Sequence, residues 1–165
     1  MLSQPAPVIP PATATAAPDT GPRTQRDLAL ESAIGSLTWP DGTTMYEGVA
    51  VAIDPVTGYA MITFEVPHSL RSSNLYDVVV RQSYPIAAAV VNTDPGVQSM
   101  TLRGILDPSG SRRERHAVVV YRGNTSRESI LYWLRRDATP SEDDIWTKVF
   151  ADTWWNPDIP RTGYR

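Results

Sequence analysis

Proline constrains this chain more than any other residue type. Of its 165 residues 15 are prolines, and the first 22 positions hold six of them among alanines and threonines. Proline fixes φ and removes an amide donor, so residues 1–22 cannot form a helix or a central strand. We predict an extended, polyproline-like arm that orders against a larger surface, such as a neighbouring subunit. The candidate interface residues in this arm are Pro5, Pro7, Pro10 and Pro11.

The length suits one domain, and the 41% of hydrophobic residues can supply a core. The absence of cysteine excludes disulfides, a cysteine nucleophile and thiolate metal sites. His68 and His116 are the only histidines, which excludes a multi-histidine metal site. No run approaches the roughly 18–20 apolar residues of a membrane span, and the first residues do not resemble a secretory signal. We therefore expect a soluble protein with no membrane partner.

Residues 37–136 read as a series of short β-rich runs bounded by turn residues. Several runs alternate with period two, which is typical of half-buried strands. About eight such strands favour an antiparallel β-sandwich, jelly roll or barrel. Because helices do not alternate with these runs, a doubly wound sheet is not expected. The predicted strands cover residues 37–39, 45–53, 59–66, 75–81, 86–91, 100–106, 117–122 and 130–135.

Asp-Pro sequences followed by glycine mark turns between these runs. Proline presets φ and glycine accepts positive φ, so residues 54–58 and 107–110 are predicted hairpin turns. The first turn would pair 49–53 with 59–65, and the second would pair 100–106 with 117–122.

Helices are predicted only at the two ends of this β region. Thr24 and Asp27 stand in capping-box spacing before a short helix over 24–34. Thr139, Pro140 and Glu142 form a second helix start, and apolar residues continue at helical spacing to Trp154. The expected organisation is an arm (1–22), a short helix (23–36), an antiparallel β domain (37–136), and a C-terminal helix with a tail (137–165).

The clearest basic feature lies in the turn after Asp107, where the candidate phosphate contacts are Arg112, Arg113 and Arg115. Such a turn can bind nucleic-acid phosphates, or it can be a solvated loop that keeps a hairpin from aggregating. Four further arginines could join it if their strands lie together: Arg122, Arg127, Arg135 and Arg136.

Trp154 and Trp155 are adjacent, so their rings cannot both face the same core. We predict that one ring is exposed or buried by something outside the subunit, and both are candidate subunit contacts. Trp146 and Phe150 are expected in the core.

No catalytic motif stands out. The acids Glu142, Asp143 and Asp144 are explained by helix capping and the helix dipole. A nucleophile elbow, a phosphate loop and a dinucleotide fingerprint are all absent from the sequence. We therefore predict a non-enzymatic protein with no catalytic residue, no metal site, no cofactor and no small-molecule substrate.

An extended arm, a compact β body and an aromatic-rich C-terminus together resemble viral structural proteins such as coat, minor capsid or capsid-decoration proteins. This resemblance implies a homo-oligomer within a capsid-like assembly and a location in the virion. Its mechanism would be subunit contact through the arm and the C-terminal aromatic residues.

Residues 100–165 also resemble the coat proteins of small single-stranded RNA bacteriophages. A strand reaches Asp107-Pro-Ser-Gly-Ser-Arg-Arg, strands begin at His116 and Ile130, and the acidic helix start at 141–144 follows. The resemblance implies a sheet that feeds a C-terminal dimerisation helix, with nucleic acid as a partner. The longer leader and the missing second C-terminal helix depart from that family, so its RNA-binding residues are not carried over.

A second class of function stays open. The chain could be a β-sandwich binding or adaptor module tethered by its Pro-rich segment, located in the cytoplasm. The oligomeric state separates the two, because a module is monomeric in isolation whereas a shell component associates.

Overall fold

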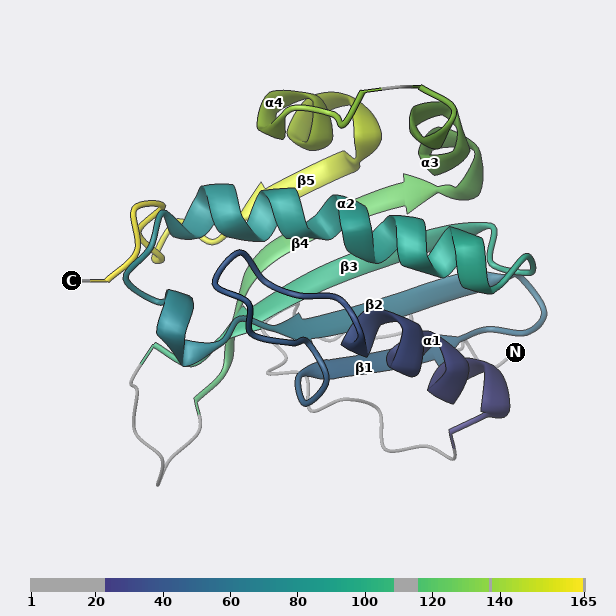
Figure 1. Cartoon of the computed structure of the whole chain (residues 1–165), viewed down its shortest axis with the longest axis horizontal. Coiled ribbons are helices and arrows are strands. Elements are labelled where there is room, and N and C mark those ends of the chain that lie inside the picture. Colours follow the sequence, from purple (N-terminus) through teal and green to yellow (C-terminus); the bar gives the residue numbers. More distant parts are fainter. Residues whose placement is uncertain (1–22, 109–115, 137, 165) are drawn as a thin grey trace, which may run out of the picture.

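The computed structural model describes residues 23–108, 116–136 and 138–164. These residues form one five-stranded sheet in the spatial order β1-β2-β3-β4-β5 (Figure 1). The strands are β1 (Val49–Ile53), β2 (Tyr59–Glu65), β3 (Ser99–Leu106), β4 (Val118–Ser126) and β5 (Ala151–Trp155).

Helices α1 (Gln25–Gly35) and α2 (Leu75–Thr93) lie together on one face of this sheet (Figure 1). Helix α3 (Arg127–Leu134), the short α4 (Glu142–Asp144) and a π-helical turn, η2 (Ile145–Val149), lie at the β5 end. A single turn, η1 (His68–Leu70), precedes α2. None of the described helices is both long enough and apolar enough to cross a bilayer.

The prediction of a mainly-β sandwich, jelly roll or barrel of about eight strands is wrong. The sheet is mixed, because β2 and β3 pair in parallel while the other neighbours pair antiparallel. A parallel pair needs a long crossover, and α2 supplies it. The molecule is therefore a two-layer α/β structure rather than two packed sheets.

The predicted strands 75–81 and 86–91 are both part of α2. Their valines and isoleucine favour strands, and Pro85 between them indicated a break. In the structure Pro85 is half-buried inside the helix. The buried side chains recur at helical spacing, which places one continuous face against the sheet: Leu75, Val79, Val80, Gln82, Ser83, Ile86, Ala87, Val90 and Val91.

Three further segments differ from prediction. Residues 130–134 are helical, in α3, with Arg135 as its C-cap, and residues 37–39 make only an isolated bridge, from Thr38 to Thr44. The C-terminal helix is capped by Ser141 rather than Thr139, and it ends at Val149. The chain then becomes β5, in which Asp152 has a φ of 52°. Pairing with β4 overrides the helical spacing of the apolar residues here.

The local predictions agree better. Helix α1 is present, and its capping box joins Thr24 and Asp27 as expected. Both predicted hairpin pairings are confirmed, β1 with β2 and β3 with β4. Gly58 takes a φ of 70° in the first turn, the conformation for which glycine was expected.

Helix α1 also closes the free edge of the sheet. The amide of Val51 donates to Glu31 Oε1 at 3.0 Å, and the amide of Ile53 donates to Asp27 Oδ1 at 3.1 Å. An edge strand otherwise offers these amides to another chain. Carboxylates of α1 therefore accept hydrogen bonds from these amides of the β1 edge within the subunit.

Candidate functional site

The face of the sheet opposite α1 and α2 carries a row of side chains that crosses four strands. Thr63 pairs with Arg103, Arg103 with Arg122, and Arg122 with Trp154 in the strand register. We call Thr63, Arg103, Arg122 and Trp154 the arginine row. Among the described residues no helix lies behind the sheet to cover this row (Figure 1).

Strand alternation explains why these four side chains share a face. Their chain neighbours Phe64, Tyr121 and Trp155 are buried on the helix-covered side. Successive side chains in a strand point to opposite faces, so the arginine row points away from the helices. In accord with this, Arg122 is exposed, and Arg103 and Trp154 are half-buried.

The two guanidinium groups have different partners. Arg103 donates from Nη2 to Thr63 Oγ1 at 3.0 Å, and from Nε to the same oxygen at 3.3 Å. Arg122 lies over the Trp154 ring, with its Cζ 5.5 Å from the ring centroid. Burial lowers the pKa of Arg103 from its usual value, because desolvation disfavours the cation.

Within the described part of the chain no carboxylate forms an ion pair with Arg103 or Arg122. Like charges on directly opposed strand residues are destabilising. Arg103 leans toward Thr63 on β2 and Arg122 toward Trp154 on β5, so each guanidinium can donate charge-assisted hydrogen bonds to an anion on this face.

A second set of polar side chains lies beside the arginine row on the same face. Tyr59 Oη donates to Thr101 Oγ1 at 2.7 Å, and Thr101 Oγ1 donates to Asn124 Oδ1 at 2.6 Å. The Asn124 amide reaches Asp152 Oδ2 at 3.5 Å. This chain of hydrogen bonds runs from β2 to β5 and fixes the side chains that border the arginines.

The structure separates the two adjacent tryptophans that the sequence singled out. Trp155 is buried, and its Nε1 donates to the carbonyl oxygen of Ile159 at 2.9 Å. Trp154 lies on the other face, against Arg122. The pair sits on strand β5 rather than on the expected helix. Their role as subunit contacts stays a prediction.

The other candidate residues divide into two groups. Phe150 is buried and Trp146 is half-buried, and both rings pack near Tyr121, as a core role requires. Seven candidates lie outside the described residues: Pro5, Pro7, Pro10, Pro11, Arg112, Arg113 and Arg115.

Sequence reasoning did not single out Arg103. The strand over 100–106 was predicted correctly, and alternation along it places Thr101, Arg103 and Ile105 on one face. What the sequence lacked was the register that puts Arg103 opposite Arg122. Pairs between strands are visible only when both partners and their alignment are known.

A pair of carboxyl groups joins α2 to α4. A hydrogen bond between Asp77 and Glu142 raises the pKa of Glu142 to about 7, with burial adding to the effect. The same hydrogen bond lowers the pKa of Asp77, and Arg81 contributes through its own hydrogen bond to that carboxylate. The pair is thus most stable when it shares one proton.

This pair predicts a pH dependence of stability. The stabilisation from protonated Glu142 is fully present below its ordinary pKa of 4.5 and is lost as pH rises through about 7. Between pH 5 and 8 the free energy of unfolding should fall by about 1 kcal/mol more in the unsubstituted protein than in Glu142→Gln, allowing for solvent screening. Urea denaturation at both pH values measures this. Asp143→Asn, at the exposed neighbouring position, is the control and should keep the pH dependence of the unsubstituted protein. If the free energy of unfolding changes equally with pH in Glu142→Gln and in the unsubstituted protein, Glu142 is not the group responsible.

No group of three or more acidic or histidine side chains that could hold a metal ion is found in the described ranges. No protein-family model, curated protein or solved structure matches this chain.

Proposed function

We propose that this protein is a non-enzymatic binding module that holds single-stranded nucleic acid on the face of its sheet opposite α1 and α2. The observation that carries the proposal is the Arg103–Arg122 pair, two cations opposed across β3 and β4 without a carboxylate partner among the described residues. A sheet face that combines arginine with aromatic rings suits a strand whose bases and phosphates are both accessible.

Each part of the face has a role in this proposal. The guanidinium of Arg122 donates to phosphate oxygens, and its planar fork permits two parallel hydrogen bonds. Trp154 beside it, and Tyr59 across the face, provide rings on which bases stack. Asn124 is half-buried, and its side-chain amide, which reaches Asp152 only at 3.5 Å, can hydrogen-bond to base edges.

A single strand fits this surface better than a duplex does. A flat sheet presents no helix to a major groove, and the bases of a duplex are already stacked. Stacking on aromatic residues requires unpaired bases. The proposal therefore includes a preference for single strands with little sequence specificity.

Fluorescence anisotropy of a labelled oligothymidylate tests the proposal. We expect Arg103→Gln/Arg122→Gln to weaken binding at least tenfold, since charge-assisted contacts are worth about 1.4 kcal/mol or more. The dependence of log K on log salt should also become shallower by about 1.4, the value for two lost phosphate contacts on a single strand.

Arg81→Gln is the charge control, because it removes one positive charge from an exposed position on α2. This variant should bind like the unsubstituted protein. Equal losses in Arg81→Gln and the double variant would indicate a general charge effect and contradict the proposal, as would a preference for duplex DNA.

The predicted roles in a virion or as a tethered adaptor stay predictions, as do the predicted locations. The substitution Trp154→Ala distinguishes a subunit-contact role from the function proposed here. A subunit contact predicts a loss of oligomer by light scattering, whereas a stacking platform predicts weaker oligonucleotide binding by a chain whose mass is unchanged.

A further inference from the structure

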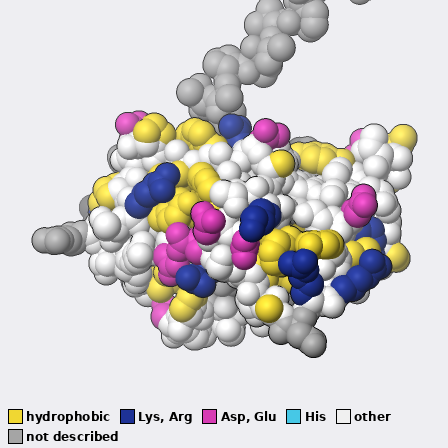
Figure 2. Space-filling model, turned by 90° about the horizontal axis from the view of Figure 1, so that it is seen from above, with side chains coloured by type: hydrophobic (Ala, Val, Ile, Leu, Met, Phe, Trp, Pro, Cys, Tyr) yellow, Lys and Arg dark blue, Asp and Glu magenta, His cyan; other side chains and the backbone are white. Residues whose placement is uncertain are grey.

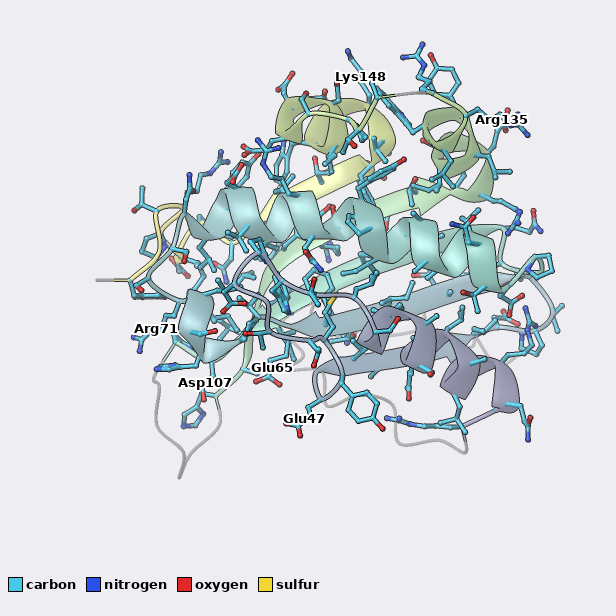
Figure 3. The ribbon with its side chains drawn as sticks, viewed as in Figure 1. Glu47, Glu65, Arg71, Asp107, Arg135 and Lys148 are labelled. Carbon is cyan, nitrogen blue, oxygen red and sulfur yellow. The ribbon has the colours of Figure 1, made fainter. Side chains whose placement is uncertain are left out.

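A cavity of about 630 Å³, open to solvent, lies between α3 and η2, and none of its described lining residues belongs to the arginine row. Its volume is within the range of small-molecule sites. Hydrophobic and basic side chains lie next to one another on this side of the molecule (Figure 2). Arg135, at the end of α3, and Lys148, on η2, mark the two elements in Figure 3.

One wall of the cavity is aromatic. Tyr132 and Trp133 meet edge to face, with ring centroids 5.7 Å apart. The Arg136 guanidinium lies over both rings, 4.4 Å from the centroid of Tyr132 and 5.2 Å from that of Trp133. Tyr132 is 52% exposed, so its ring is accessible to a ligand in the cavity.

A second cation faces this wall. Lys148 lines the cavity together with Arg136 and forms a surface ion pair with Asp144 at 2.9 Å. Asp144 raises the pKa of Lys148, and the positive charge of Arg136 acts in the opposite direction, so the two cations lie within each other's field. A surface ion pair is weak enough for Lys148 to exchange Asp144 for a dianion.

Hydroxyl and carboxylate groups complete the lining. Ser126 and Ser129 lie at the start of α3, where Ser126 Oγ already accepts the Ser129 amide at 3.1 Å and can still donate. Among the described residues that line the cavity, Glu128 is the one carboxylate. It can accept hydrogen bonds from the ribose hydroxyls or the amino group of a base.

We propose that this cavity binds a nucleoside monophosphate group, with its phosphate between Arg136 and Lys148 and its base stacked on the Tyr132–Arg136 wall. Arginine and aromatic planes both stack bases, and the two cations supply the charge for a phosphate dianion. Inorganic phosphate leaves the aromatic wall unused, and a nucleoside leaves the cations unpaired. The group could come from a free nucleotide or from the phosphorylated end of a strand.

Isothermal titration of the full chain with AMP tests this proposal, with adenosine and inorganic phosphate as the partial ligands. We expect AMP to bind at least tenfold more tightly than either partial ligand. Arg136→Gln and Lys148→Gln should each weaken AMP binding about tenfold, the loss of one charge-assisted contact. Tyr132→Ala should weaken AMP and adenosine alike.

Arg135→Gln is the matched control, because Arg135 is the exposed neighbour that does not line the cavity. Its binding should equal that of the unsubstituted protein. Equal affinities for AMP and inorganic phosphate, equal losses in Arg135→Gln and Arg136→Gln, or no AMP binding at millimolar concentration would each overturn the proposal.

Two further experiments identify where the nucleotide group comes from and test whether the cavity binds it independently of the arginine row. Tighter binding of a 5′-phosphorylated oligonucleotide than of the same oligonucleotide with a 5′-hydroxyl supports a strand end, and equal binding of the two supports a free nucleotide. AMP binding that persists in Arg103→Gln/Arg122→Gln supports this site as independent of the sheet face. AMP binding lost in that variant but kept in Arg136→Gln would overturn it.

Discussion

Replacing Asp27 by alanine is expected to lower the free energy of unfolding by about 2 to 3 kcal/mol. This buried carboxylate accepts the Thr24 amide on Oδ2 at 2.9 Å and the Ile53 amide on Oδ1 at 3.1 Å. The first bond belongs to the capping box of α1 and the second to the free edge of β1. Alanine removes both acceptors at once and leaves the two donors without a protein partner. Urea denaturation followed by circular dichroism measures the loss.

Asp27→Asn separates the two contributions. One amide oxygen can still accept one of the two donors, so the loss should be about half that of alanine. The exposed β1 edge in Asp27→Ala should also increase association at high protein concentration, measured by light scattering. A destabilisation below about 0.5 kcal/mol would show that α1 does not close this edge.

Replacing Arg127 by alanine is expected to cost about 3 kcal/mol, the other large effect. Its guanidinium donates to three carbonyl oxygens at and beyond the C-terminal end of α2: Val91 at 3.1 Å, Asp94 at 3.0 Å and Val97 at 3.2 Å. The Val91 carbonyl is among the last four of the helix, which lack intrahelical partners, and a cation there also interacts favourably with the helix dipole. Loss of the Arg127 side chain is expected to destabilise α2, which carries the largest apolar face of the helical layer.

Lysine tests the geometry of this interaction. A single ammonium group cannot follow the planar fork of Arg127, so Arg127→Lys should recover less than half of the lost stability. Arg135→Ala, an exposed change at the other end of α3, should cost no more than about 0.5 kcal/mol. Similar midpoints for Arg127→Ala and Arg135→Ala in urea would refute the role assigned to Arg127.

Features decided by neighbouring residues were predictable from the sequence. The turn at 54–58 is one: Asp54 Oδ1 accepts the Val56 amide at 2.9 Å and Gly58 has a positive φ. The α1 capping box is another, because Thr24 and Asp27 are three residues apart. Such contacts close within one turn of chain, so residue type and spacing suffice to predict them.

Features that depend on long-range contact were not predictable in the same way. The valines of α2 suit a strand as well as a helix, and the choice was made by packing Leu75, Val79 and Val90 against the sheet. Trp154 continues the helical spacing of the residues before it, yet β4 pairs with it as a strand. In both places the burial of apolar surface outweighs a local preference that is worth less than 1 kcal/mol per residue.

The candidate site shows the same division. By itself, the sequence determined the arm-like composition of residues 1–22, the two hairpins, the capped α1 and the placement of the two tryptophan rings on different sides. Only the tertiary structure decided that Arg103 lies opposite Arg122 and beside Trp154. The physical reason is register: a shift of one residue in strand pairing would turn these side chains to the other face. That register is held by the packed core and the closed β1 edge, which no local pattern describes.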